Sequence, residues 1–210
     1  MRPYLKDPAA IYAASFAAVR AEAALERFPP DLAEVAVRVV HACGMVEVAD
    51  RLAFSDGAAR AGRDALLSGA PVYADCAMVA AGITRRLLPD ATEVRCTLDD
   101  PRVAAMAQEG RTTRSAAAVD LWDTGGAVVA IGNAPTALFR LLERLDGGAA
   151  PPALILGFPV GFVGAAEAKA ELARDPRGAA FLTLRGRRGG SAMASAAVNA
   201  LGILARGGVQ

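Results

Sequence analysis

The histidine at position 41 is the residue of this chain best suited to proton transfer, and it is the only histidine among 210 residues. An unperturbed imidazole gains or loses a proton near neutral pH, so it can act there as a general acid or base. His41 lies in the apolar stretch 39–46, where a structural histidine buried in the core or placed at a helix end would also fit. The residue types elsewhere in the chain must therefore decide whether this imidazole has a chemical role.

Three glycine-rich segments, residues 132–136, 157–164 and 185–192, follow apolar runs and lead into predicted helices. Loops of this kind present backbone amides to an anion, and the helix dipole strengthens the attraction. The third segment also has guanidinium and hydroxyl groups suited to a carboxylate, although a tight turn at 186–189 is an alternative. Its candidate ligand-binding residues are Arg185, Gly186, Arg187 and Ser191.

A further predicted helix opens at Thr113 and Arg114, which add a hydroxyl and a guanidinium to the free amides of its first turn. This segment has the same donors as the loop at 185–192 and is a second candidate carboxylate-binding site. One imidazole and several arginine-bearing anion sites together indicate a proton-assisted reaction on a polycarboxylate.

Other ligand classes lack their motifs in this sequence. The segment 186–191, Gly-Arg-Arg-Gly-Gly-Ser, does not have the spacing of a nucleotide-phosphate loop, and no Gly-x-Gly-x-x-Gly follows the first predicted strand. The three cysteines, Cys43, Cys76 and Cys96, form no Cys-x-x-Cys pair, so neither a disulfide framework nor a zinc site is expected. We therefore expect no metal site and no cofactor.

Composition is typical of a globular cytoplasmic protein. The length fits one domain, residues 1–210, and a formal net charge of +1 argues against non-specific nucleic-acid binding, which usually needs a basic excess. Although 54% of the residues are hydrophobic, none of the apolar stretches reaches about 18 residues without charges, so no membrane span is expected. The N-terminus has no apolar signal-peptide core, and we expect a cytoplasmic location.

The hydrophobic pattern predicts helices over residues 8–27, 32–43 and 55–68, with His41 on the last turn of the second and Gly44 as its stop. Five apolar runs then follow, at 71–75, 93–98, 127–131, 153–156 and 180–184. Helical stretches between and after them begin near Cys76, Pro101, Thr113, Pro135, Gly164 and Ser191. This alternation predicts an α/β fold: a single domain with a largely parallel five-stranded sheet, helices on both faces and extra N-terminal helices.

Several longer motifs occur in order over most of the chain. They are Asp-Pro-Ala-Ala-Ile-Tyr at 7–12, Ser-Phe at 15–16, His-Ala-Cys-Gly at 41–44, Thr-Arg-Ser-Ala-Ala at 113–117, Ala-Ile-Gly-Asn-Ala-Pro-Thr-Ala-Leu at 130–138, Pro-Val-Gly-Phe-Val-Gly-Ala-Ala-Glu at 159–167, and Arg-Gly-Arg-Arg-Gly-Gly-Ser-Ala at 185–192. With these motifs the chain resembles the precorrin-8X methylmutase family of corrin-ring biosynthesis. The runs at 132–137 and 159–164 are the most specific of them.

The resemblance implies a 1,5-sigmatropic migration of a methyl group from C11 to C12 of precorrin-8X, which gives hydrogenobyrinate and consumes no methyl donor or nicotinamide. It places the family's catalytic histidine at His41, which would protonate the macrocycle at or beside ring C, and a substrate contact at Ser15. It also implies a homodimer with the substrate near the interface. Our own candidates for holding the acetate and propionate arms are Thr113, Arg114 and the loop from Arg185 to Ser191.

Two other functions stay open at this point. One is the same rearrangement on cobalt-precorrin-8, although the His-Ala-Cys-Gly-Met context at 41–45 favours the metal-free substrate. The other is a tetrapyrrole carrier that holds the product without turning it over. The presence of His41 and of complete anion loops favours an isomerase over a carrier.

Overall fold

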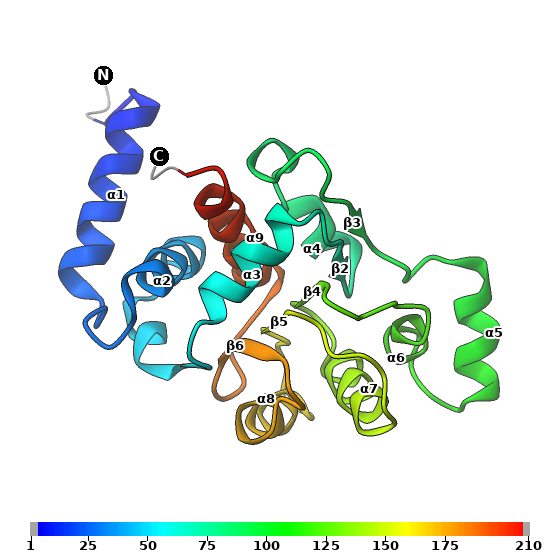
Figure 1. Ribbon diagram of the computed structural model, residues 1–210. Helices are drawn as coiled ribbons and strands as arrows, with labels where there is room; N and C mark the ends of the chain where they lie inside the picture. The colour runs from blue at the N-terminus through cyan, green and yellow to red at the C-terminus, as the bar shows by residue number, and fades with distance from the viewer. Residues whose placement is uncertain (1–3, 208–210) are drawn as a thin grey trace.

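The sheet at the centre of the fold is made from the apolar runs identified in the sequence (Figure 1). In the computed structural model, which describes residues 4–207, four strands pair in parallel in the order β6, β5, β4, β2, and β3 follows β2 as a fifth parallel strand. These strands are β2 (Val72–Ala74), β3 (Val94–Arg95), β4 (Val128–Ile131), β5 (Leu154–Gly157) and β6 (Ala180–Leu184). The predicted α/β fold with a largely parallel sheet is confirmed.

The sheet has six strands rather than the five predicted, because β1 (Leu52–Phe54) forms its other edge. β1 pairs antiparallel with β6, and Leu52 lies opposite Leu184. A run of three residues has no measurable periodicity, so pairing with β6 determines this strand more than its own sequence does.

Successive residues of each strand point to opposite faces of the sheet, and helices cover both faces. In β4, Val128 and Ala130 belong to the core on one face, and Val129 and Ile131 belong to the core on the other. The first face is covered by α2 (Pro30–Cys43), α3 (Ala58–Leu67), α4 (Ala77–Gly82) and α9 (Ser191–Ala205), and the second by α7 (Pro135–Asp146) and α8 (Ala165–Arg174).

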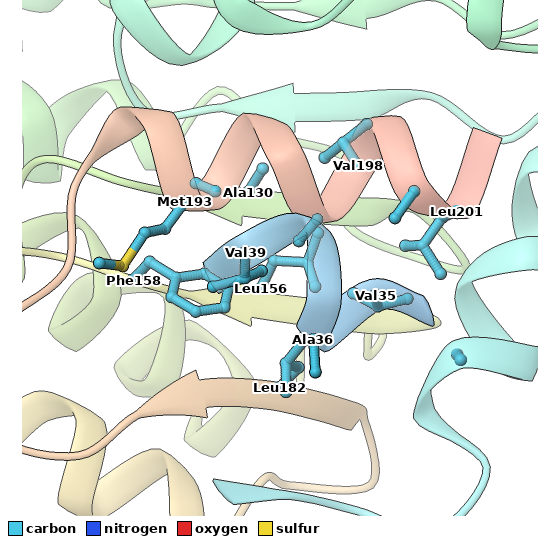
Figure 2. Close-up of a cluster of buried hydrophobic side chains, with 14 of the residues drawn as sticks. Val35, Ala36, Val39, Ala130, Leu156, Phe158, Leu182, Met193, Val198 and Leu201 are labelled. Carbon is cyan, nitrogen blue, oxygen red and sulfur yellow. The ribbon is translucent and has the colours of Figure 1, made fainter. Parts of the chain in front are cut away.

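The core of the first face is formed mainly by α2 and α9. Figure 2 shows Val35 and Val39 of α2 and Val198 and Leu201 of α9 gathered over the sheet, with Leu156 of β5 beneath them. Each of these side chains is at most 1% exposed. This packing fixes the position of α2 on the sheet. It therefore also fixes the positions of the side chains on the outer face of α2.

The remaining helices lie outside these layers (Figure 1). They are α1 (Pro8–Glu22), which packs on α2, and α5 (Pro101–Glu109) and α6 (Arg114–Val119), which pack on each other, with α6 also against α7. Two short 3-10 helices, η1 (Val46–Arg51) and η2 (Arg85–Leu87), follow α2 and α4. Within residues 4–207 no helix is both long and apolar enough to cross a lipid bilayer.

Two predicted helix limits are wrong for reasons that depend on distant contacts. α1 ends at Glu22 and not at residue 27, because the Arg27 guanidinium instead donates to the carbonyl oxygens of Ala49 and Leu52. The third helix begins after residue 55, because the Ser55 amide and hydroxyl continue the pairing with β6 by bonding to the backbone of Phe181.

Candidate functional site

His41 lies on the last turn of α2 with its side chain exposed to solvent. Gly44 ends the helix in a left-handed conformation with φ of 67°, which glycine adopts without steric cost. The imidazole is thus at a helix end, as the sequence predicted, and not in the core.

The structure brings Ser15 and His41 together. The Ser15 hydroxyl lies 2.8 Å from Nδ1 of His41 and forms a hydrogen bond with it. Tyr12 and Phe16, on the same face of α1, place their rings 5.9 Å and 5.0 Å from the imidazole, the latter edge-on. Because Nδ1 is occupied by Ser15, Nε2 is the ring nitrogen left to contact a ligand.

A cleft of about 530 Å³ opens beside His41, between α1, α2, α9 and η2. Tyr12 and Phe16 form its aromatic wall, and Arg38 and Arg86 bring two guanidinium groups to it. The Arg38 guanidinium lies 5.1 Å from the centroid of the Phe16 ring. Among the described residues neither arginine pairs with a carboxylate, so both remain able to bind an anionic ligand.

Sequence reasoning missed Arg38 and Arg86. A signal for Arg38 was present, because residues three apart on a helix share one face and Arg38 precedes His41 by one turn. For Arg86 there was no such signal, since η2 reaches the cleft only through tertiary packing. That packing is held by Asn199 of α9, whose carboxamide accepts from the Thr84 amide at 2.8 Å and donates to the Gly82 carbonyl at 3.0 Å.

One face of α9 connects this cleft with the glycine-rich loop at 185–191. Ala196, Asn199 and Ile203 line the cleft at helical spacing, and Ala192, one turn before Ala196, is exposed on the same face. Ser191 then begins the helix directly after the loop. Ala192 and Ala196, the residues of this face nearest the loop, are small and leave room for a ligand that extends from His41 toward the loop.

The segment 185–191, called the arginine loop below, packs against the loop 158–164 that follows β5. The Gly190 amide donates to the Phe158 carbonyl at 2.8 Å, and the Gly161 amide donates to the Arg187 carbonyl at 3.2 Å. The Arg187 guanidinium lies 5.5 Å from the centroid of the exposed Phe162 ring.

The side chains of the arginine loop point toward different parts of the molecule. Arg188 pairs with Glu47 of η1 at 2.6 Å, just past the end of α2. The Ser191 hydroxyl lies 3.6 Å from the Cys76 thiol. Arg185 and Gly186 line a separate cleft of about 460 Å³ along α8. None of the predicted loop residues lines the His41 cleft itself, and Arg185 and Gly186 line a different one.

Asp75 changes the expectation for the loop at 132–136. This carboxylate, 2% exposed at the end of β2, accepts hydrogen bonds from three successive amides, those of Gly132, Asn133 and Ala134, at 2.8–3.0 Å. Burial raises the pKa of Asp75, while the three amides act in the opposite direction. The amides predicted to bind a ligand anion are thus already occupied by a carboxylate of the chain itself.

Thr113 and Arg114 stand at the start of α6, and α6 lies at the other end of the molecule from α1 and α2 (Figure 1). The Thr113 hydroxyl caps α6 by accepting from the Ala116 amide and lies 2.8 Å from the Thr136 hydroxyl. Arg114 is exposed and pairs with Asp99 at 3.1 Å. Within one chain these two residues do not reach the His41 cleft.

The cysteines are free thiols, and burial raises the pKa of Cys43 and Cys96. In the part of the chain that the structure describes, no three His, Cys, Asp or Glu side chains gather in an arrangement that could hold a metal ion.

Comparison with known proteins gives consistent matches over nearly the whole chain. A family model described as precorrin-8X methylmutase matches residues 10–204. A precorrin-8X methylmutase of Pseudomonas aeruginosa is 60% identical over 96% of this chain and 98% of its own, and a cobalt-precorrin-8 methylmutase of Priestia megaterium is 36% identical over 99% and 93%. A crystal structure of a precorrin-8x methyl mutase from Thermus thermophilus, 39% identical, superimposes with a TM-score of 0.83 over 95% of this chain and 100% of that chain.

Proposed function

The chain belongs to the precorrin-8X methylmutase family of isomerases in cobalamin biosynthesis, and from this premise we propose that it moves a methyl group from C11 to C12 within precorrin-8X to give hydrogenobyrinate. The observation that carries the proposal is the pairing of the only imidazole with Ser15, in a cleft that also holds two guanidinium groups without a carboxylate partner among residues 4–207. This set of groups fits a proton-assisted reaction on a carboxylate-bearing macrocycle.

His41 is the proton donor in this proposal. Ser15 holds Nδ1, so the protonated ring presents its Nε2–H to the macrocycle at or beside ring C. Protonation of the conjugated ring favours the 1,5-shift, and the proton returns to His41 once the methyl group has moved, so substrate and product are isomers. A positioned acid supplies a rate factor of about 10² to 10⁴. Holding the ring in its reactive geometry contributes further.

The cleft holds the macrocycle through aromatic and cationic groups. Tyr12 and Phe16 contact the flat ring, and Arg38 and Arg86 bind the nearest carboxylate arms. A tetrapyrrole with its arms is larger than a cleft of about 530 Å³. We propose that the rest of the ligand extends along α9 to Arg187 and Ser191 of the arginine loop.

Thr113 and Arg114 would contribute to the site of a second copy of the chain. Neither residue lines the His41 cleft of its own chain, and the family resemblance implies a homodimer with substrate near the interface. We propose a cytoplasmic homodimer in which these residues face the cleft of the partner subunit.

Two alternatives concern the substrate and turnover. The 60% identity to a precorrin-8X methylmutase, against 36% to a cobalt-precorrin-8 methylmutase, favours the metal-free substrate. A carrier that holds product without making it would have no need of an imidazole oriented by Ser15 in the cleft. The same assay distinguishes all three functions.

The purified protein, dialysed exhaustively against a chelator, is expected to convert precorrin-8X to hydrogenobyrinate with no added S-adenosylmethionine. The reaction moves a methyl group within one molecule and therefore needs no donor. Product formation is followed by visible absorbance and mass spectrometry, with cobalt-precorrin-8 assayed in parallel. Binding without turnover would identify a carrier, and faster turnover of the cobalt substrate would identify the other pathway. Activity that chelation abolishes and zinc or cobalt restores would contradict the mechanism.

Arg187→Ala is expected to weaken hydrogenobyrinate binding by about 1.5–3 kcal/mol, the usual contribution of a hydrogen bond to a charged group. The side chain is exposed and packs on the exposed Phe162 ring, so its removal should leave the fold intact. Isothermal titration measures the dissociation constant. Arg63→Ala on α3, whose partly exposed side chain pairs with the neighbouring Asp64, is the matched control. An unchanged dissociation constant for Arg187→Ala would mean that the ligand does not reach the arginine loop.

A further inference from the structure

Lys169 is fully buried on α8, although proteins rarely bury a lysine without a carboxylate partner. Within residues 4–207 its ammonium makes no salt bridge and one hydrogen bond, which it donates to the carbonyl oxygen of Arg188 at 2.5 Å. The only other lysine of the chain, Lys6, is exposed. Burial lowers the pKa of Lys169 to about 8, which shows how unfavourable this environment is for a charge.

Stability gives no reason for a lysine at this position. A buried charge without a partner is destabilising, and replacing buried ionic groups by apolar side chains of similar volume is often neutral or stabilising. The hydrogen bond to Arg188 is therefore the feature that indicates what Lys169 does.

The bond fixes the orientation of one peptide group in the arginine loop. A trans peptide points its carbonyl and its N–H in opposite directions, and no peptide bond in the described chain is cis. Because Lys169 draws the Arg188 carbonyl inward, the Gly189 amide points outward. Among the described residues this amide donates to no other group.

Close packing against residues 158–159 also restricts the backbone at position 189. A Cβ atom there would overlap the carbonyl oxygens of Phe158 and Pro159, so only glycine lets the loop lie this close to the chain that follows β5. The Gly190 amide bonds to the same Phe158 carbonyl. The hydrogen bond from Lys169 and the close contact with residues 158–159 thus restrict the 188–189 peptide to one orientation.

We propose that Lys169 is a positioning residue for substrate binding, which holds the arginine loop so that the Gly189 amide and the Arg187 guanidinium together face a carboxylate arm of the corrinoid. The inference rests on the proposed function of the site. Lys169 does not touch the ligand. It preorganises the Gly189 amide and the Arg187 guanidinium, and this lowers the entropic cost of ordering the loop when the ligand binds.

Lys169→Met tests this role, because methionine keeps an unbranched chain of similar length and removes the donor. We expect KM for precorrin-8X and the dissociation constant for hydrogenobyrinate to rise roughly tenfold or more, the scale of one lost charge-assisted interaction. Turnover at saturating substrate should change by less than about threefold, because His41 still donates its proton. The melting temperature should stay equal or rise.

Lys6→Met, which removes the other lysine, is the matched control and should leave KM unchanged. A folded Lys169→Met variant with unchanged KM would overturn the inference, as would a parallel fall in stability and turnover at unchanged KM. If the wild-type protein itself fails to convert precorrin-8X, the proposed function fails first, and the two failures are thus distinguishable.

A second measurement uses the wild-type protein and does not depend on a variant that folds. With only two lysines, a spectrum of protein labelled with ¹³C at the lysine ε position contains two signals, and Lys6→Met assigns them. Saturation with hydrogenobyrinate should shift the Lys169 signal, because the bound carboxylate lies across the same peptide group. A Lys169 signal that does not move at saturation would contradict the proposal.

Discussion

Replacement of His41 by alanine is expected to lower the turnover of precorrin-8X by at least about 100-fold, because a lost general acid has that effect on rate. This corresponds to about 2.7 kcal/mol or more of transition-state stabilisation. No other imidazole is available to take over, since His41 is the only histidine of the chain. Arg38 and Arg86 stay in place, so binding of the product should be largely retained.

The variant should fold normally, which separates a catalytic from a structural effect. The imidazole is exposed, and its loss should change the melting temperature by less than about 2 °C. Ser15→Ala is the companion variant: it leaves the imidazole without its partner at Nδ1 and should reduce turnover less than His41→Ala does. Single-turnover absorbance measurements check both. Turnover near the wild-type rate in His41→Ala would remove this residue from the mechanism.

Asp75→Asn is expected to produce the largest loss of stability, about 3 kcal/mol. An asparagine side chain offers one oxygen in place of two and turns its own N–H₂ toward backbone amides, so at least one of the Gly132–Ala134 donors loses its acceptor inside the protein. A buried donor left without a partner costs about 1–3 kcal/mol. For a chain of this size the melting temperature should fall by roughly 6–12 °C.

Asp56→Asn provides the control for this variant. Asp56 is exposed in the turn before α3, and its side chain makes no hydrogen bond among the described residues. Its replacement should change stability by less than about 0.5 kcal/mol. Calorimetry measures both variants. An Asp75→Asn protein as stable as the control would show that the three amides find other acceptors and that Asp75 does not hold the loop at 132–136.

Local signals in the sequence predicted most of the elements. Asp7 before Pro8 and Asp100 before Pro101 each cap a helix with a side-chain oxygen, and Thr113 caps α6 in the same way. The parallel strands β2, β4, β5 and β6 were found because both of their faces are buried, which produces continuous apolar runs. β1 and the end of α1 were not predicted, because β6 and the contacts of Arg27 determine them from a distance.

The candidate site was predictable only in part. The pairing of Ser15 with His41 agrees with the motifs that place both in the site, but helical spacing alone would not have joined residues on two different helices. Asp75 was overlooked because a single acidic residue after a short strand has no motif, and its role depends on amides that lie more than 55 residues later. The sequence pattern indicated only that Lys169 belongs to a helix, and the structure shows that it is buried.

The most direct test of the central claim follows the methyl group itself. Precorrin-8X labelled with ¹³CD₃ at C11 and with ¹⁵N in the ring is mixed with unlabelled substrate, and the wild-type protein converts the mixture without a methyl donor. The account predicts hydrogenobyrinate that carries the intact ¹³CD₃ group at C12, always together with the ¹⁵N ring, and no product with His41→Ala beyond about 1% of the wild-type rate. Product in which methyl and ring labels have separated, or in which C11 still carries the label, would contradict an intramolecular shift at this site.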